Sequence, residues 1–269
     1  MSALCGPLDL GGGAPSWLPP DTMHAAKSAA RGGGFVKVQR RRHERLESLH
    51  ALEALRRDHG LCAPALLDSG VVDGGWWATY ERVEGQAAQT ASPAQQRALG
   101  AQLRRWHDHG ATSSLRLDAP GALAVFLGTA RARVPEVYPA LAARLDAACR
   151  GQPMCAMHGD VAVTHNTLWQ GDALTAIIDP GGVDVGPPML DLAVALAMDL
   201  PRGGAVDPLL AGYGPDAVDR AALDAFLPLM LLRRLVDAVE LKRTADARWL
   251  EARLQGDALL GATLGALFR

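Results

Sequence analysis

The sequence predicts an α+β fold in two lobes, with a small strand-rich N-terminal lobe and a larger, mainly helical C-terminal lobe. Short strand-like runs separated by turn residues lie before Gly85, whereas apolar residues at helical spacing dominate the chain after it. The 269 residues are enough for two lobes with a sizeable core. We therefore expect an N-terminal lobe over residues 1–85 and a C-terminal lobe over residues 86–269.

Composition and charge narrow the class of protein. Hydrophobic residues make up 49% of the chain and charged residues 21%, as in ordinary soluble globular proteins. Residues 1–10 lack the pattern of a signal peptide, and no apolar run approaches the roughly 18 residues of a membrane span. A net charge of −2 argues against nucleic-acid binding. We expect a cytoplasmic protein, either a monomer or a homodimer, that uses neither a membrane nor a nucleic acid as a partner.

The N-terminal lobe is expected to contain short strands and one helix. Residues 35–38 alternate as a strand that includes Lys37, and leucines at helical spacing predict a helix over residues 43–58. Residues 71–83 contain two strand-like runs joined by Asp-Gly-Gly, which predicts a hairpin. The glycine-rich segment before these elements is as typical of flexible turns as of a loop that covers phosphates.

Helical periodicity dominates the C-terminal lobe. One helix is expected to begin at Pro93 and to end near His107. The apolar spacing after Asp191 predicts four further helices, over residues 192–199, 207–212, 219–241 and 245–268.

The stretch from residue 157 to residue 192 combines apolar runs with polar residues at their ends. The apolar runs at 167–169 and 174–178 are joined by Gln-Gly-Asp, which predicts a β-hairpin. Asp160 lies in the loop that enters the hairpin, and Asp179 lies where the chain leaves it. The two carboxylates can therefore approach each other.

This stretch resembles the catalytic loop and the metal-binding segment of the kinase-like small-molecule phosphotransferases, the aminoglycoside phosphotransferase and fructosamine kinase family. The resemblance rests on four motifs in order, His158-Gly159-Asp160, Asn166, Ile178-Asp179 and Asp191-Leu192-Ala193. Turn chemistry explains each motif when it is taken alone, but not the whole series. Ile-Asp-Pro is most similar to the streptomycin-kinase-like branch. The resemblance implies a two-lobed protein-kinase-like fold.

The resemblance also implies roles for individual residues. Asp160 would be the catalytic base, and Asp191 would anchor its loop. Asp179 and Asn166 would hold Mg²⁺, which prefers carboxylate oxygens and phosphates. His165 stands where the family normally has its asparagine. We choose Asn166 because imidazole is a poor magnesium ligand, and His165 stays the alternative.

Nucleotide-binding residues follow from the same resemblance. Lys37 would contact the α- and β-phosphates and pair with a glutamate of the following helix, for which we choose Glu47. The main chain of Glu81 and Val83, in a hinge-like segment, would bind adenine. Because such contacts are main-chain, GTP stays open beside ATP. For any single one of these residues, an ordinary solvated side chain is the competing explanation.

The resulting prediction is an ATP- and Mg²⁺-dependent O-phosphotransferase that acts on a hydroxyl of a small molecule, with an antibiotic as the favoured acceptor. A ketosamine, sugar or metabolite kinase is one alternative, and a nucleotide-binding pseudokinase is another. From residue 184 to residue 257 the chain has twelve acidic and eight basic residues. This excess would suit a cationic acceptor, and solvated helix faces explain it equally well.

Overall fold

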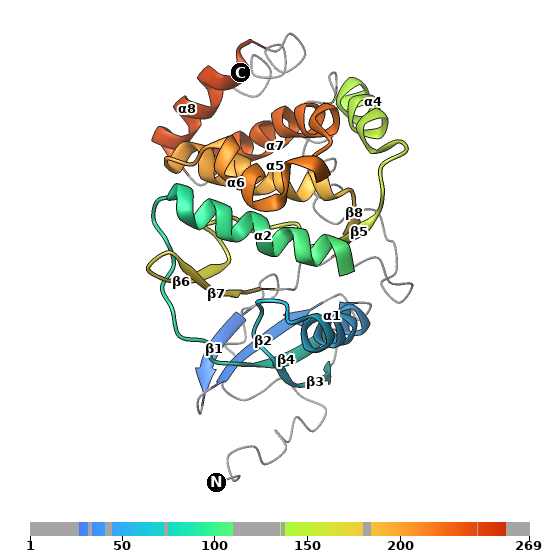
Figure 1. The fold of residues 1–269 in the computed structure, drawn as a ribbon, viewed down its shortest axis with the longest axis vertical. Helices are drawn as coiled ribbons and strands as arrows, with labels where there is room; N and C mark the ends of the chain where they lie inside the picture. The colour runs from blue at the N-terminus through green and yellow to red at the C-terminus, as the bar shows by residue number, and fades with distance from the viewer. Residues whose placement is uncertain are drawn as a thin grey trace.

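The computed structural model describes residues 27–31, 34–40, 45–72, 75–109, 135, 138–179, 184–240 and 242–256. These residues form two lobes along the long axis of the molecule, with a four-stranded sheet and one helix at one end and a group of helices at the other (Figure 1). The glycine-rich N-terminal segment and the last part of the final predicted helix lie outside the described residues.

Four antiparallel strands form the sheet of the N-terminal lobe, in the order β1-β2-β4-β3. The strands are β1 (Lys27–Arg31), β2 (Gly34–Arg40), β3 (Leu66–Val72) and β4 (Gly75–Glu81). Helix α1 (Arg45–His59) lies beside this sheet (Figure 1). The predicted helix and the predicted hairpin of this lobe are confirmed, the hairpin as β3 and β4.

A small apolar core joins α1 to the sheet. Trp76, Ala78 and Tyr80 are buried and alternate along β4, so they project from the same face of the sheet. Leu49 of α1 belongs to the same buried cluster. The helix ends where Gly60 adopts a φ of 63°, a left-handed conformation that glycine takes without strain.

Helix α5 lies at the centre of the C-terminal lobe, because every residue from Met189 to Asp199 is buried. Helix α5 spans Pro188–Asp199. The other helical elements of this lobe are α2 (Pro93–His109), α4 (Tyr138–Cys149), η2 (Leu200–Arg202), α6 (Val206–Tyr213), η3 (Pro215–Ala217), α7 (Arg220–Glu240) and α8 (Thr244–Leu254). The predicted helices after Asp191 are confirmed over the described residues.

Helices α2 and α6 pack with their backbones in contact. A Cβ atom added at Gly100 would collide with the carbonyl oxygen of Leu209, and one added at Gly212 would collide with the carbonyl oxygen of Arg97. Both positions therefore need glycine because of the close approach of the two helices.

A hairpin connects the two lobes. It consists of β6 (Thr167–Gln170) and β7 (Ala173–Ile177), and it confirms the predicted hairpin. Gln86 and Trp169 exchange two backbone hydrogen bonds of 2.9 Å, and the Ile177 N–H donates to the carbonyl of Cys62 over 2.7 Å. A further pair of short strands, β5 (Cys155–Met157) and β8 (Asp184–Gly186), was not predicted. These connections fix the hairpin against both lobes.

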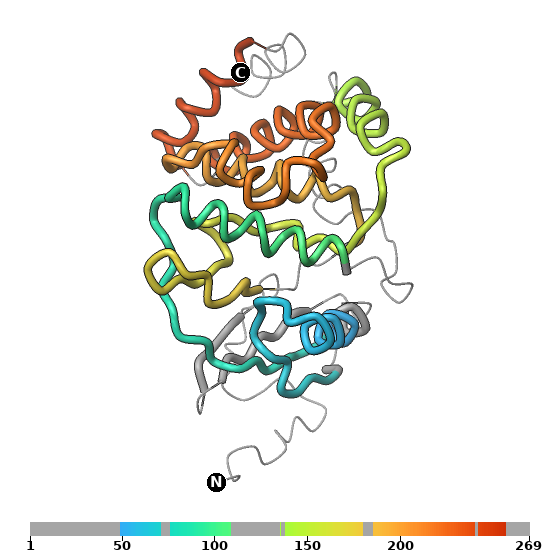
Figure 2. The backbone as a smooth tube through the Cα atoms, viewed as in Figure 1, coloured from blue at the N-terminus to red at the C-terminus, as the bar shows by residue number. Residues whose placement is uncertain are grey.

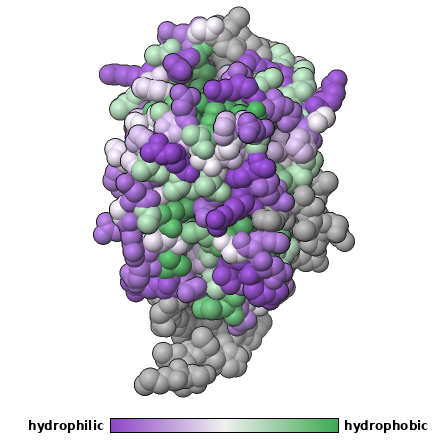
Figure 3. All heavy atoms as spheres, in the orientation of Figure 1, coloured by the Kyte–Doolittle hydropathy of each residue, from purple (hydrophilic) through white to green (hydrophobic). Residues whose placement is uncertain are grey.

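The surface of the C-terminal lobe is mostly polar on the face shown in Figure 3, where apolar residues form small groups between polar ones. Among the described helices, none combines the length and the apolar character that crossing a membrane requires.

Candidate active site

The candidate site is built on the loop of residues 158–166, which joins β5 to β6 and which we call the catalytic loop. In Figure 2 this part of the chain runs between the helices of the C-terminal lobe and the hairpin that faces the N-terminal lobe. Asp160, His165 and Asn166 all belong to it. The positions of these side chains therefore depend on what holds the loop.

Asp191 holds the first part of the catalytic loop. Its buried carboxylate accepts the backbone N–H of His158 over 2.9 Å and that of Gly159 over 2.8 Å. Burial raises the pKa of this carboxyl, but hydrogen bonds and the nearby His107 outweigh burial, so the pKa lies below its ordinary value. An ionised Asp191 thus anchors the loop, as predicted.

His107 supports this anchor from α2. One ring nitrogen lies 3.3 Å from an Asp191 carboxylate oxygen, and the other lies 2.9 Å from the hydroxyl of Tyr213. The ring is buried and both nitrogens have partners. His107 is therefore a structural residue.

Asp199 holds the second part of the catalytic loop, and the sequence analysis did not identify it. Its carboxylate accepts the N–H of Val163 over 2.9 Å and the N–H of Thr164 over 3.0 Å. The Thr164 hydroxyl donates to the same carboxylate over 2.9 Å. Burial raises the pKa of Asp199 above its ordinary value in spite of these bonds. The signal in the sequence was an acidic residue directly after the apolar run of residues 192–198.

His158 connects the catalytic loop to the end of β7. Its Nε2 lies 3.0 Å from the carbonyl oxygen of Ile178, which makes this nitrogen the donor. The ring is fully buried, and burial lowers its pKa, so it is neutral at physiological pH. This bond fixes the residue immediately before Asp179 against the catalytic loop.

Asp160 is the half-exposed carboxylate of the site. The ring of His165 approaches one of its oxygens to 3.3 Å, and the side-chain amide of Asn166 donates to its backbone carbonyl over 2.8 Å. Burial raises the pKa of Asp160, but the contact with His165 and nearby positive groups outweigh it, so the pKa lies below its ordinary value. Asp160 is therefore ionised at neutral pH and able to accept a proton.

Asn166 and Asp179 lie at the two ends of the hairpin, and both adopt left-handed conformations, with φ of 56° and 59°. Non-glycine residues rarely do so, and such strain is concentrated at functional sites. The Ile178 N–H donates to the carbonyl of Asn166 over 2.8 Å, which brings the two residues together. The catalytic loop and the hairpin thus place Asp160, Asn166 and Asp179 in one region.

The donor set at this point fits a magnesium ion that also binds phosphates. The Asn166 amide nitrogen donates to Asp160, so its oxygen faces away and is available as a ligand. Asp179 supplies an exposed carboxylate. Mg²⁺ usually takes one or two carboxylates and completes its shell with phosphates and water. Within the described part of the chain, no group of three or more His, Cys, Asp or Glu side chains could hold a metal by itself.

The predicted phosphate-binding residues lie in the N-terminal lobe. The backbone of Lys37 lies in the middle of β2, opposite Ala78 of β4, and Glu47 lies near the start of α1. Glu53, further along α1, is occupied by Arg56 at 2.7 Å and by the Leu66 N–H at 3.0 Å. A pair between Lys37 and Glu47 stays a prediction.

The hinge-like segment follows β4. The N–H of Glu81 donates to the carbonyl of Ala65 over 2.9 Å, so it is not available to a nucleotide. Val83 lies between the end of β4 and the bridge from Gln86 to Trp169. Contacts of Glu81 and Val83 with adenine stay predictions, and for Glu81 they are limited to its carbonyl.

Comparison with solved structures shows the same fold in antibiotic phosphotransferases. The aminoglycoside phosphotransferase APH(3'')-Id from Streptomyces rimosus, solved with ADP and streptomycin, is 21% identical over 74% of this chain and 87% of its own, with a TM-score of 0.54. The macrolide 2'-phosphotransferase MphH from Brachybacterium faecium is 20% identical, covers 82% and 83% of the two chains, and has a TM-score of 0.53. A GDP complex of aminoglycoside 2'-phosphotransferase-IIIa is 16% identical, covers 89% and 94%, and has a TM-score of 0.53.

These neighbours confirm the two-lobed kinase-like fold that the sequence predicted. No curated protein matches the chain. A model of the phosphotransferase enzyme family (APH), however, matches residues 27–226, which include the sheet of the N-terminal lobe, the catalytic loop and the hairpin. Since this match covers most of the chain, the protein belongs to the phosphotransferase enzyme family.

Proposed function

We propose that this phosphotransferase moves a phosphoryl group from ATP, with Mg²⁺, to a hydroxyl of a small molecule, and that an antibiotic is its acceptor. The observation that supports this most directly is the grouping of Asp160, Asn166 and Asp179 by the catalytic loop and the hairpin. Phosphoryl transfer needs a positioned carboxylate for the acceptor and oxygen ligands for the metal. The cytoplasm, where ATP and Mg²⁺ are available, is the compartment we propose.

Asp160 acts on the acceptor in this proposal. Its ionised carboxylate, partly exposed beside the loop, accepts a hydrogen bond from the acceptor hydroxyl and orients the oxygen toward the phosphate. It receives the hydroxyl proton as the acceptor oxygen bonds to the γ-phosphorus and the bond from that phosphorus to the leaving ADP breaks. The ring of His165, 3.3 Å from the carboxylate, restricts the orientation of Asp160.

The carboxylate of Asp179 and the amide oxygen of Asn166 hold the magnesium ion in this proposal. When bound, Mg²⁺ neutralises charge on the nucleotide phosphates and keeps them aligned. The hydrogen bond from Ile178 to the carbonyl of Asn166 keeps the two ligands at a fixed separation. Lys37, paired with Glu47, and the main chain of Glu81 and Val83 would complete the nucleotide site.

Antibiotics are proposed as acceptors because the structural neighbours described above include phosphotransferases for aminoglycosides and macrolides. The neighbours also include complexes with ADP and with GDP, so the choice between ATP and GTP needs a direct measurement. The expectation of a monomer or a homodimer, without a nucleic-acid partner, stays a prediction.

The experiment is a screen for ADP or GDP release over antibiotics, sugars and ketosamines, with and without Mg²⁺, followed by location of the phosphate on the product by mass spectrometry. We expect turnover that requires Mg²⁺ and disappears in Asp160→Asn. Asp216→Asn, an exposed aspartate on η3, is the matched control and should retain full activity. Hits confined to sugars or ketosamines would favour a metabolite kinase, and nucleotide binding without any turnover would favour a pseudokinase.

A further inference from the structure

The catalytic loop contains a short turn, residues 162–165, which lies between Asp160 and Asn166 in the sequence. Two backbone hydrogen bonds close it: the Ala162 N–H donates to the carbonyl of His165 over 2.9 Å, and the His165 N–H donates to the carbonyl of Ala162 over 3.1 Å. We call it the 162–165 turn. Because one residue of the candidate site lies on each side of it, a shift of this turn would move both.

Trp169 of β6 holds the 162–165 turn from the side of the hairpin. Its buried indole N–H donates to the carbonyl of Val163 over 3.0 Å and lies 2.8 Å from the hydroxyl of Thr167. That hydroxyl has one proton for two carbonyls, those of Ala162 and Val163, which lie 3.0 and 2.7 Å away. The indole therefore supplies a second donor to the backbone of the turn.

The main chain of Trp169 is bonded to the segment that joins the two lobes, residues 82–92 between β4 and α2, which we call the linker. Gln86 and Trp169 exchange two backbone hydrogen bonds of 2.9 Å. A Cβ atom added at Gly85 would lie 2.9 Å from the Cβ of Leu168 and 3.1 Å from the backbone nitrogen of Trp169, so the linker lies directly against β6. Trp169 thus bonds to the linker through its main chain and to the catalytic loop through its side chain.

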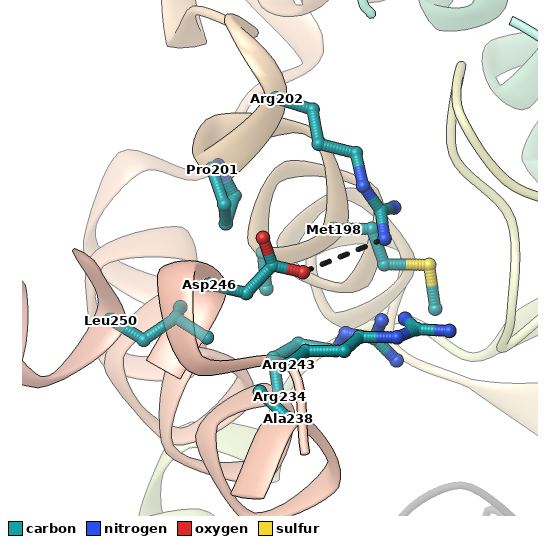
Figure 4. Close-up of a pocket in the computed structure, with 9 residues that line it drawn as sticks. Met198, Pro201, Arg202, Arg234, Ala238, Arg243, Asp246 and Leu250 are labelled. Atoms are coloured by element: carbon teal, nitrogen blue, oxygen red, sulfur yellow. Dashed lines mark ion pairs between the residues drawn. The ribbon is translucent and has the colours of Figure 1, made fainter. Parts of the chain in front are cut away.

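Arg202 of η2 makes a second connection between the same two segments. Its carbonyl accepts the N–H of Ala91, near the end of the linker, over 3.2 Å. Its guanidinium donates to the hydroxyl of Thr164 over 3.0 Å, and that hydroxyl donates in turn to Asp199. The guanidinium also lies 3.8 Å from the carboxylate of Asp246 on α8, the ion pair that Figure 4 marks with a dashed line. Arg202 therefore reaches the linker, the catalytic loop and α8.

The two connections meet at adjacent residues of the catalytic loop. Trp169 contacts the linker near its start and Arg202 contacts it near its end, while their side chains bond to Val163 and Thr164. A segment held at one point can pivot about that point. Two separate points of attachment fix both the distance and the orientation of the linker relative to the loop.

We propose that Trp169 and Arg202 are positioning residues for phosphoryl transfer, because they set the 162–165 turn at a fixed place relative to the linker. This inference rests on the proposed function, in which main chain around the start of the linker binds adenine and the catalytic loop directs the acceptor and the metal. Groups on these two segments must be aligned for transfer, and a misplacement of about 1 Å can slow a reaction about a hundredfold. Neither side chain touches the nucleotide or the acceptor in this proposal.

The first test replaces Trp169 by phenylalanine, which keeps an aromatic ring and removes the indole N–H. Trp76→Phe is the matched control, because this indole is also buried and, among the described residues, has no hydrogen-bond partner. We expect kcat to fall about tenfold in Trp169→Phe, as for the loss of one hydrogen bond. KM for ATP should change by less than about twofold, because the main-chain bonds to Gln86 remain. Trp76→Phe should keep the wild-type kcat.

The second test removes the other connection. Arg202→Met loses both the donation to Thr164 and the ion pair with Asp246, whereas Asp246→Asn loses only the ion pair. We expect kcat to fall about tenfold in Arg202→Met and by less than about twofold in Asp246→Asn, since an ion pair of this length contributes little. An equal fall in both variants would show that Arg202 acts through α8 and not through the loop, and would overturn its assignment.

Hydrogen exchange examines the 162–165 turn without any turnover. Mass spectrometry follows amide exchange in peptides that cover residues 160–166, and peptides from α7 report global opening. In Trp169→Phe and Arg202→Met we expect the loop to exchange at least about tenfold faster, with α7 unchanged, and no change in either control.

Three results would overturn the proposal: wild-type exchange in the loop of both variants, equal acceleration in the loop and in α7, or an unchanged kcat in both variants. The second of these would mean that the two residues stabilise the whole fold and do not position the loop. A wild-type protein without turnover would count against the proposed function, and the exchange rates would still decide whether the two side chains hold the turn.

Discussion

Replacement of Asp191 by asparagine tests whether this residue positions the catalytic loop. One carboxylate oxygen of Asp191 accepts the N–H of Gly159, and the other accepts the N–H of His158 and contacts His107. Asparagine has one oxygen and one NH₂ group. In either orientation, at least one buried N–H of the loop loses its acceptor and faces another donor.

The size of the effect follows from these bonds. A buried donor left without a partner costs about 1–3 kcal/mol, and the orientation that sacrifices only Gly159 is the less costly one. We therefore expect Asp191→Asn to lower the free energy of unfolding by about 2 kcal/mol. For a chain of this size, that corresponds to a decrease in Tm of roughly 4–8 °C. Because the displaced segment includes the residue next to Asp160, kcat should fall by at least about tenfold.

The pH dependence of the same variant gives a further check. The pKa of Asp191 in the folded protein lies below the ordinary value of 3.8, so its contribution to stability is present above that pH and is lost as the pH falls through the folded value. The stability difference between wild type and Asp191→Asn should therefore be constant near neutrality and shrink below about pH 4. Urea unfolding followed by circular dichroism at several pH values measures it, with Asp216→Asn as the exposed control. A difference smaller than about 0.5 kcal/mol at pH 7 would refute the reasoning.

Three further substitutions test separate contacts. Gly100→Ala should lower the free energy of unfolding by about 1–3 kcal/mol, because the new methyl group meets the backbone of α6. Gly256→Ala is the control and should leave this free energy unchanged, because there is open space around Gly256. Chemical denaturation of the two variants measures the difference. His165→Ala should raise the pKa of Asp160, so the acidic limb of the kcat/KM profile moves to higher pH; an unmoved limb would mean that His165 does not act on Asp160. Asn166→Ala should raise the Mg²⁺ concentration for half-maximal rate at least tenfold, and an unchanged requirement would exclude it as a ligand.

Local patterns explain which parts of the fold could be predicted. The hairpin of β6 and β7 was evident because apolar runs flank turn residues, and α1 was evident from leucines at helical spacing. The pairing of β5 with β8 was not evident, since each strand has three residues and 26 residues, 158–183, separate the two. Short strands of this kind are fixed by the surrounding packing and leave no period in the sequence.

The same distinction applies to the candidate site. Asp160, Asn166 and Asp179 could be proposed as site residues because they occur in a recognisable order beside the hairpin. Asp199 was not identified, because an acidic residue at the end of an apolar run does not reveal which distant N–H groups it accepts.

The spacing of Asp191 and Asp199 explains why the catalytic loop can be both irregular and fixed. The two residues are eight positions apart at the two ends of one buried helix, a rise of about 12 Å at 1.5 Å per residue. One carboxylate accepts the N–H groups at the start of the loop, and the other accepts those near its end. A loop without regular structure thus has its polar backbone satisfied by a rigid element. Thr164 joins Asp199 to Arg202, so the hydrogen bonds that hold the loop extend from the end of α5 to η2.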